Sequence, residues 1–460
     1  MGLSLNARYE RYCEVMVAAL GHADRAQPAR QYLKGLVLPG ARKSVEPMAA
    51  RVAPQAVRST HQSMHHLVST ASWSDAALLA AVAGQVLPKL LCGGEPTWWI
   101  IDDTGFPKKG RHSVGVAHQY CGQVGKTANC QVAVSLSMAS RRGSLPVSYR
   151  LYLPESWSED AERCATVGVP ESVSFATKGA LARQQIEAAL DVGHPRGTVL
   201  ADAAYGDETG WREWLASRGL TYAVGVRPAC SVWWGAHQPV SEVPKRRGAR
   251  GKQPTHLTRD AAHPPISVAA LAHALPAKSF RSISWSEGST PRLTSRFARV
   301  RVRAAHRDVP RDAEWLVIEW PSGASAPTRY WLSNLPESTA WRPLIETIKA
   351  RWRSERDYQE LKQELGLGKY EGRNWRGFHH HASLCIAAYG FLIRERLTET
   401  KKNAAGFKAP PVPEGFQPRG HSSHAATRAV VDRDLPISPD PSHQPMPGPR
   451  VGRLVGLAKY

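Results

Sequence analysis

Short apolar runs that end in acidic residues mark the middle of the chain. Residues 98–101 are two tryptophans followed by two isoleucines, and this run ends at Asp102 and Asp103. Residues 198–201 form a second run, which ends at Asp202. Continuous apolar runs of this length are typical of strands that are buried on both faces of a sheet.

The sequence around these runs predicts an α/β fold. The further elements predicted here are strands at 114–120, 130–138 and 221–226 and helices at 178–190 and 208–217. Sequential strands followed by alternating helices and strands are typical of a mixed α/β sheet.

The part of the chain before this sheet is predicted to be helical and basic. Residues 9–20 and 76–86 have the apolar spacing of helices, so the first 95 residues are predicted to be helical. Scattered arginines and lysines in this part allow two interpretations, a solvated basic face on a small helical bundle or a DNA-end-binding domain.

Short strands separated by loops rich in proline, glycine and arginine predict an all-β insertion between residues 227 and 328. The strands of this insertion are predicted at 280–285, 297–304 and 314–320. A strand at 330–335 and one long helix at 339–365 then return to the main fold. From residue 401 the chain is polar and rich in proline, which predicts a disordered tail.

The sequence therefore predicts five regions. They are a helical region (1–95), which the family resemblance given below implies to be DNA-binding, the first part of an α/β core (96–226), a β-rich insertion (227–328), the second part of the core (329–400) and a disordered tail (401–460).

The charge of the chain favours a polyanionic partner. Its 60 lysines and arginines against 39 aspartates and glutamates give a net charge of +21, while 42% apolar residues are enough for a folded core. Nucleic acid is the first candidate. The seven cysteines are scattered without a Cys-x-x-Cys pair, which argues against a disulfide framework and a zinc module. With no secretory pattern and no uninterrupted span, we expect a cytoplasmic protein, associated with the nucleoid when bound to DNA.

Three acidic residues suit metal-dependent chemistry. Asp103 and Asp202 each close an apolar strand, and Glu355 lies on the predicted long helix. Three converging carboxylates would bind Mg²⁺ or Mn²⁺, as in phosphodiester chemistry. An aspartate at a strand end is also a common cap or turn former. Arg351 and Lys362 share the helix face of Glu355, but the spacing alone does not select Glu355 among the acids of this helix.

Several fragments, taken together, resemble bacterial insertion-sequence transposases of the DDE class. The fragments are IDDTGFPKKG at 101–110, HSVGV at 112–116, QYCG at 119–122, LADAAYG at 200–206, RWxxE at 351–355, Lys362 and GLGKYEGR at 366–373. The similarity is to the branch with a β-rich insertion between the second aspartate and the glutamate. It implies a ribonuclease H-like core, interrupted by that insertion.

The resemblance also implies roles for individual residues. Asp103, directly before a threonine, would be the first metal ligand, with Asp202 as the second and Glu355 as the third. Asp102 is the alternative for the first position, because adjacent residues of a strand face opposite ways. The helix signature further implies that Arg351 and Lys362 contact the phosphates of the transposon end. Ile348 stands where the signature has a tyrosine.

Further contacts with double-stranded DNA are expected from basic residues. Lys108 and Lys109 would neutralise phosphate, and Arg299, Arg301 and Arg303 leave one face of a predicted strand. A second basic group is the loop of Lys245, Arg246, Arg247, Arg250 and Lys252.

Aromatic residues of the insertion allow two interpretations. One of Trp233, Trp234 and Trp285 would hold a flipped base, as the resemblance implies, or all three fill the small β core. Adjacent histidines at 379–381 are not framed by metal ligands, and we expect them to touch DNA phosphate or solvent.

The sequence thus predicts a transposase that cuts and joins insertion-sequence ends. The expected partners are terminal inverted repeats and target DNA, and the resemblance implies a homodimer on paired ends. The alternative is a catalytically inactive or domesticated DNA-binding protein derived from such an enzyme.

Overall fold

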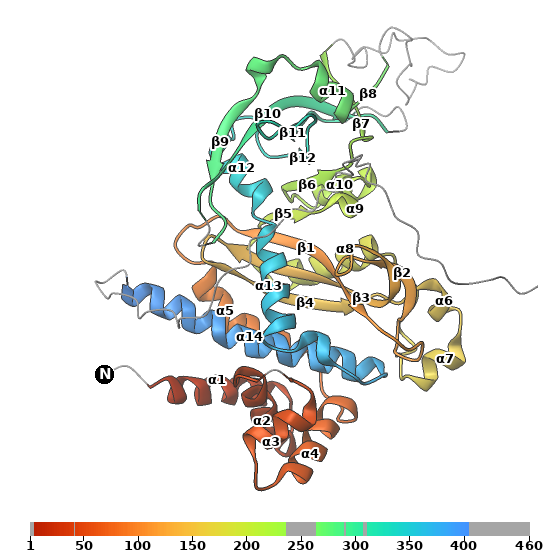
Figure 1. Cartoon of the computed structure of the whole chain (residues 1–460), viewed down its shortest axis with the longest axis vertical. Helices are drawn as coiled ribbons and strands as arrows, with labels where there is room; N and C mark the ends of the chain where they lie inside the picture. Colours follow the sequence, from red (N-terminus) through yellow and green to blue (C-terminus); the bar gives the residue numbers. More distant parts are fainter. Residues whose placement is uncertain (1–3, 41, 236–263, 289–290, 307–310, 404–460) are drawn as a thin grey trace, which may run out of the picture. The chain divides into compact units, whose positions relative to one another are not determined.

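A large mixed sheet crosses the centre of the molecule, with helices packed against it (Figure 1). The structure is a computed structural model, and it describes residues 4–40, 42–235, 264–288, 291–306 and 311–403. Within these residues the sheet has 12 strands in the order β2-β3-β1-β5-β6-β12-β11-β10-β7-β8, with β4 paired to β3 and β9 paired to β10. The mixed α/β fold predicted from the sequence is confirmed.

The strand bounds overlap the predicted positions, but β1 continues past Asp102 and Asp103, where its apolar run ends, to Pro107. They are β1 (Trp98–Pro107), β2 (Ala117–Cys121), β3 (Lys126–Ser140), β4 (Gly143–Leu151), β5 (Thr198–Ala201), β6 (Tyr222–Val226), β7 (Ser231–Trp233), β8 (Ile266–Ser267), β9 (Arg281–Trp285), β10 (Leu293–Ala304), β11 (Glu314–Glu319) and β12 (Arg329–Ser333). The strand β4 was not predicted, since its polar residues hide its alternation.

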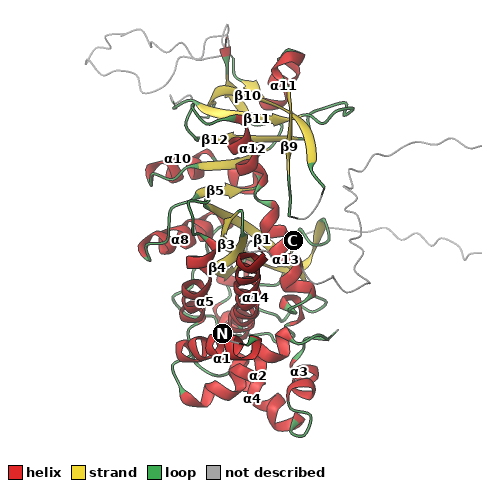
Figure 2. Ribbon diagram, turned by 90° about the vertical axis from the view of Figure 1, so that its left-hand side faces the viewer, coloured by secondary structure: helices red, strands yellow, loops and turns green. Residues whose placement is uncertain are grey.

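The helices lie at both ends of the chain and between the strands. They are α1 (Leu5–Ala19), α2 (Ala26–Val37), α3 (Val45–Val52), α4 (Val57–Ser69), α5 (Asp75–Leu90), α6 (Glu155–Ser158), α7 (Ala161–Thr166), α8 (Lys178–Asp191), α9 (Ala203–Gly206), α10 (Thr209–Ser217), α11 (Val268–Ala274), α12 (Trp341–Lys349), α13 (Trp352–Gln363) and α14 (Trp375–Asn403), with short 3₁₀ turns η1 (Ala23–Arg25), η3 (Ala277–Ser279) and η4 (Leu367–Lys369). Figure 2 shows α1 to α4 gathered at the end of the molecule away from β10 and β11.

The insertion continues the central sheet. Strand β12 pairs antiparallel with β6 on one side and with β11 on the other, so the strands of the insertion extend the same hydrogen-bonded sheet. The prediction of an all-β insertion is wrong, because α11 packs Val268, Leu271 and Ala272 onto this part of the sheet. The predicted basic loop at 245–252 and the tail from residue 404 lie outside the described residues.

The two faces of β1 contact different helices. Trp98 and Ile100 pack with Leu344 and Ile345 of α12, whereas Trp99 and Ile101 pack into the larger core that includes residues of α5, α8 and α14. Strand β5 lies parallel to β1, with Ile100 in register with Leu200. Trp98 and Ile100 of β1 and Leu200 of β5 therefore lie on the side of α12, and Asp102 and Asp202 follow with the same parity.

The prediction of one long helix at 339–365 is wrong. The chain forms two helices there, α12 and α13, with a break at Ala350 and Arg351. At the break, backbone N–H groups bond three residues back; the N–H of Ala350 donates to the carbonyl of Thr347 and the N–H of Ser354 to that of Arg351. Ile348, at the position of the signature tyrosine, is buried in the apolar core. From the break, the side chain of Arg351 reaches the carboxylate of Asp102 in β1 at 3.2 Å.

No helix among the described residues is both long and apolar enough to cross a membrane. All seven cysteines lie in the described part and are free thiols.

Candidate active site

Asp102 and Asp202 lie on one face of two adjacent parallel strands. Ile100 pairs with Leu200 in the β1–β5 register, so Asp102 and Asp202 follow two residues later on the same face. This is the face covered by α12 and approached by α13. The electrostatic influence of Asp202 on Asp102, which raises the pKa of Asp102, agrees with this proximity.

The first residues of α13 bind Asp102. Its carboxylate accepts a hydrogen bond of 2.8 Å from the Ser354 hydroxyl, and Arg351 lies 3.2 Å from it. Asp102 is only 8% exposed. Burial raises the pKa of Asp102 to about 6, although Arg351 and the Ser354 hydrogen bond act in the opposite direction.

Arg351 joins Asp102 to Glu355. Its guanidinium donates a 2.7 Å hydrogen bond to Glu355, four residues further along, and also contacts Asp102. The Glu355 side chain is 62% exposed, so its carboxylate faces solvent at the rim of this group. One cation therefore compensates two carboxylates that reach the same place from a strand and a helix.

Asp202 follows β5 and begins α9. Its carboxylate accepts a hydrogen bond of 2.9 Å from the backbone N–H of Ala204, so it caps this short helix. Asp202 is therefore a helix cap, as one of the two interpretations predicted. A cap bond to one oxygen leaves the other oxygen of the carboxylate to serve as a ligand.

Asp103 points to the opposite face of β1. Its carboxylate forms an ion pair of 2.5 Å with Lys178, the first residue of α8. The Lys178 ammonium also lies 5.9 Å from the centre of the Tyr152 ring. The shared face with Asp202 and Arg351 thus favours Asp102, the alternative first ligand, over Asp103. Ser354 and Lys178, which hold the two aspartates, follow no sequence pattern that would have identified them.

The donor set suits a hard divalent cation. Asp102, Asp202 and Glu355 offer only carboxylate oxygens, the ligands that Mg²⁺ and Mn²⁺ prefer. Within the part of the chain that the structure describes, no three acidic, histidine or cysteine side chains are gathered tightly enough to hold a metal ion. Arg351 supplies the positive charge between two of these carboxylates, and a metal would have to share or displace its contacts.

The three lysines predicted to contact DNA differ in how many hydrogen bonds they make within the protein. Lys362 donates to the backbone carbonyl of Gly105 (2.9 Å) and to Gln123 (3.1 Å), and burial lowers the pKa of Lys362 to about 8. Lys108 donates to the carbonyl of Tyr370 (2.8 Å). Lys109 is exposed and borders a cavity of about 610 Å³.

This cavity is lined by several basic side chains. Its lining residues are Lys109, Arg111, Val116, Ala117, His118, Asn129, Ser156 and Arg163, without any carboxylate. Arg163 stacks 3.6 Å over the ring of Trp157 and donates to the carbonyl of Arg111. These contacts fix one cation at the border of the cavity and leave Lys109 exposed.

The three arginines of β10 are all engaged by the protein itself, Arg301 and Arg303 within the insertion and Arg299 on the segment before α12. Arg299, Arg301 and Arg303 each donate to a backbone carbonyl, in the first case that of Thr339 at 2.5 Å. Arg299 also lies 4.5 Å from the ring centre of Trp315. All three are half-buried, so part of each guanidinium serves the fold, and their contact with DNA stays a prediction.

The three tryptophans considered for a flipped base are packed to different degrees. Trp233 is buried, Trp234 packs against the core of the insertion, and Trp285 is half-buried with its ring nitrogen donating 2.8 Å to Glu287. The packing interpretation accounts for Trp233, whereas the structure does not test base binding by the other two.

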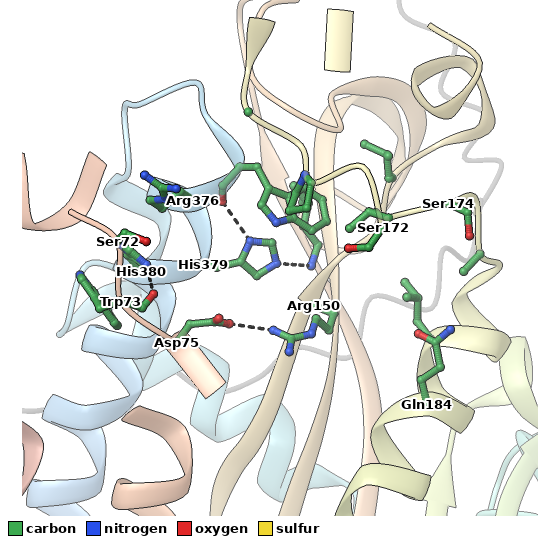
Figure 3. A pocket seen from close by; sticks show the side chains of 18 residues that line it. Ser72, Trp73, Asp75, Arg150, Ser172, Ser174, Gln184, Arg376, His379 and His380 are labelled. Atoms are coloured by element: carbon green, nitrogen blue, oxygen red, sulfur yellow. Dashed lines mark hydrogen bonds and ion pairs between the residues drawn. The ribbon is translucent and has the colours of Figure 1, made fainter. Parts of the chain in front are cut away.

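The expected contact of residues 379–381 with DNA or solvent is wrong. His379, His380 and His381 are at most 4% exposed. Figure 3 shows His379 and His380 at the wall of a cavity of about 460 Å³, beside the ion pair of Asp75 with Arg150. A neutral imidazole can both donate and accept, so these residues can pair backbone groups inside the protein.

Each histidine has internal partners. The nitrogens of His379 lie 3.0 Å from the carbonyl of Trp375 and 3.3 Å from the N–H of Leu151. Burial lowers the pKa of His379 to about 4 and that of His381 also to about 4. These neutral histidines join α14 to the sheet and to the N-terminal helices.

The chain belongs to the DDE superfamily endonucleases, whose family model matches residues 15–292. The matched range includes Asp102, Asp103 and Asp202 and ends before Glu355. The mixed sheet with helices packed against it agrees with such a nuclease.

A curated relative narrows the comparison. The chain is 29% identical over 167 residues to a probable transposase for insertion sequence element IS701 from Microchaete diplosiphon. The similar region covers 36% of this chain and 40% of that relative, so the chain spans less than half of the relative's length.

Proposed function

We propose that this chain is a DNA transposase that cuts the ends of an insertion sequence and joins them to target DNA. The observation that supports this most directly is Arg351, which contacts both Glu355 and Asp102, a residue in the middle of β1. The adjacent parallel strand presents Asp202 on the same face. Membership of the endonuclease superfamily and the likeness to a probable transposase support the same reading.

The strand order supports a ribonuclease H-like core. Strands β4, β3 and β1 form an antiparallel group, and β5 and β6 continue the sheet parallel to β1. Asp102, within β1, and Asp202, directly after β5, would lie close together because the two strands are parallel and Ile100 is in register with Leu200. The insertion between β6 and β12 separates this core from the helix that bears Glu355.

Asp102, Asp202 and Glu355 would hold Mg²⁺ or Mn²⁺, with Asp102 in the place that the sequence pattern gave to Asp103. Bound metal ions of this kind activate a water or hydroxyl and stabilise the leaving oxygen in phosphodiester chemistry. Arg351 orients two of these carboxylates in the structure. Lys362 adds positive charge beside β1, where a scissile phosphate would lie.

Two reactions follow from this arrangement. In hydrolysis a water oxygen bonds to phosphorus, the bond to the 3′ oxygen breaks, and a proton passes to that oxygen. In strand transfer the freed 3′ oxygen bonds to a phosphorus of target DNA, and the target's own 3′ oxygen leaves. Both replace one phosphodiester oxygen by another, so one carboxylate centre can serve both.

The expected partners are the terminal inverted repeats and target DNA, with two copies of the chain on paired ends. The net charge of +21 favours binding to phosphate. The homodimer rests on the family resemblance.

Cleavage of a labelled duplex that contains the inverted repeat flanking the gene would test this function. With Mg²⁺ the wild type should nick the duplex, and Glu355→Gln should not. Glu364→Gln is the matched control, because Glu364 is an exposed acid at the end of the same helix. Both variants should still bind the duplex. Tight binding without cutting by the wild type would instead support the non-catalytic DNA-binding protein.

A further inference from the structure

Helices α3 and α4 form a helix-turn-helix. They are joined by the four residues 53–56, and α2 packs against both. A methyl group on Gly35 of α2 would lie 2.9 Å from the Cβ of Met48 in α3, so these helices pack in close contact. Two helices joined by a turn of three or four residues are a recurrent DNA-binding unit, in which the second helix enters the major groove.

The two sides of α4 differ in chemistry. Its buried side is formed by Thr60, Met64, Leu67 and Val68. Its exposed residues are Arg58, Ser59, Gln62, His65 and His66. The sequence of α4 contains no acidic residue. This face is polar and suited to hydrogen bonding, although it is not engaged by another element of the described chain.

The surroundings of α4 are basic. The basic residues between positions 26 and 70 are Arg30, Lys34, Arg42, Lys43, Arg51 and Arg58, whereas Glu46 is the only acid in that range. Lys43 is used internally, because its ammonium caps backbone carbonyls at the end of α2. Arg30 is also engaged, in an ion pair of 2.6 Å with Glu10. The exposed cations Lys34, Arg42 and Arg58 complement the phosphates that border a DNA groove.

Helix α14 fixes the C-terminal end of α4. Asn374 donates 3.0 Å to the carbonyl of Ser69, and Arg376 donates 2.8 Å to that of Thr70. A ring nitrogen of His380 lies 3.0 Å from the carbonyl of Val68. The first two turns of α4, with Arg58 and Gln62, are left free to approach a partner.

We propose that α4 is a recognition helix that enters the major groove of duplex DNA and contacts base edges through Arg58 and Gln62. The two residues are four apart and share one face near the helix N-terminus, the part that contacts bases in such units. Arginine pairs with the O6 and N7 of guanine, and glutamine with the N6 and N7 of adenine. The inference rests on the proposed function only in naming DNA as the partner, since it concerns a surface separate from the carboxylates.

The test uses the full-length protein in EDTA, where metal-dependent cutting cannot occur. Duplexes are selected from a random-sequence library by binding to the wild type, and one selected duplex is compared with its scrambled form. Gln62→Ala should weaken binding to the selected duplex roughly five- to hundredfold and leave binding to the scrambled duplex unchanged. Gln27→Ala, an exposed glutamine on α2, is the matched control and should change neither.

A second measurement does not depend on a variant. Methylation of guanine N7, which lies in the major groove, should block binding of the wild type within the selected sequence, whereas methylation of adenine N3 in the minor groove should not. Failure to enrich any sequence, an equal loss on both duplexes, or interference from the minor groove alone would overturn the recognition helix.

The proposed function and this inference fail in different ways. Selective binding that depends on Gln62, without cutting in Mg²⁺, supports the recognition helix and contradicts the transposase. Cutting in Mg²⁺ by a protein that selects no sequence overturns the recognition helix and leaves the carboxylate chemistry in place.

Discussion

The ammonium group of Lys349 lies 2.7 Å from the carboxylate of Glu319, and both side chains are buried. The ring centres of Trp285, Trp331 and Phe297 lie 4.4, 5.3 and 5.5 Å from that ammonium. Lys349 ends α12 just before the break, and Glu319 ends β11 of the insertion. One ion pair therefore fastens the insertion to the segment that presents Arg351.

Loss of one partner of this pair should destabilise the protein strongly. Lys349→Met leaves Glu319 buried without its cation, and breaking such a pair costs about 3–5 kcal/mol. The free energy of unfolding, measured by chemical denaturation, should fall accordingly. The double variant Lys349→Met with Glu319→Gln should lose less than Lys349→Met alone, because no unpaired charge remains. Equal stability of wild type and Lys349→Met would show that the pair does not hold α12 in place.

Asp102 and Asp103 should differ in their effect on cleavage. Asp102→Asn removes the carboxylate that contacts Ser354 and Arg351, so we expect no detectable nicking of an end-containing duplex. Asp103→Asn breaks the pair with Lys178 on the opposite face and should reduce cleavage by at most about 10- to 100-fold, as for a supporting residue. Near-normal cleavage by Asp102→Asn together with none by Asp103→Asn would restore the assignment that the sequence pattern favoured.

Acid should destabilise the protein through its buried histidines. The Tyr32 hydroxyl lies 2.8 Å from one nitrogen of His381, and the carbonyl of Gly366 lies 3.0 Å from the other, so the neutral ring is satisfied. Burial lowers the pKa of His381 to about 4, below the ordinary value of 6.5. The unfolded chain therefore binds a proton first as the pH falls. The contribution of neutral His381 to the free energy of unfolding is therefore full above about pH 6.5, and it is lost as the pH falls from 6.5 to about 4.

This pH dependence can be assigned with a variant. A difference of about 2.5 pH units corresponds to roughly 3 kcal/mol. His381→Gln should be less stable than the wild type at pH 7. Between pH 7 and pH 4, however, its free energy of unfolding should fall by roughly 3 kcal/mol less than that of the wild type. Parallel stability curves for the two proteins would mean that His381 does not titrate as expected.

Lys109 should contribute one phosphate contact to DNA binding. Its ammonium is exposed at the basic cavity near the end of β1. Each neutralised phosphate adds about 0.9 to the slope of log affinity against log salt concentration. Lys109→Gln should reduce that slope by about one. Arg218→Gln, a cation already paired with Glu187 at 2.6 Å, should leave it unchanged. An unaltered slope for Lys109→Gln would remove Lys109 from the DNA interface.

Local sequence determined the secondary structure of the core. The apolar runs at 98–101 and 198–201 predict β1 and β5, because a strand buried on both faces needs apolar residues at every position. The sequence also determined that acids follow both apolar runs and that Arg351 and Glu355 lie one helical turn apart. These are properties of spacing, and spacing is visible in a sequence.

Contacts between distant segments decided the rest. Whether Asp102 or Asp103 faces the site depends on which helix covers each face of β1, and that is set by Ser354 and Lys178, far away in the chain. No proline or glycine stands at the break at Ala350 and Arg351. On one side of it Lys349 pairs with Glu319 of the insertion, and on the other Ser354 donates a hydrogen bond to Asp102.

Histidines 379–381 show the same limit. By sequence they are polar residues on a helix, and burial was not expected. In the folded protein their nitrogens lie within hydrogen-bonding distance of backbone groups of β4, of α4 and of Gly366, just before η4, which compensates the loss of water. The sequence by itself thus determined the elements and the kinds of side chain at their ends. Only the tertiary structure decided which of those side chains meet, because burial and pairing depend on partners in other elements of the fold, which local spacing does not reveal.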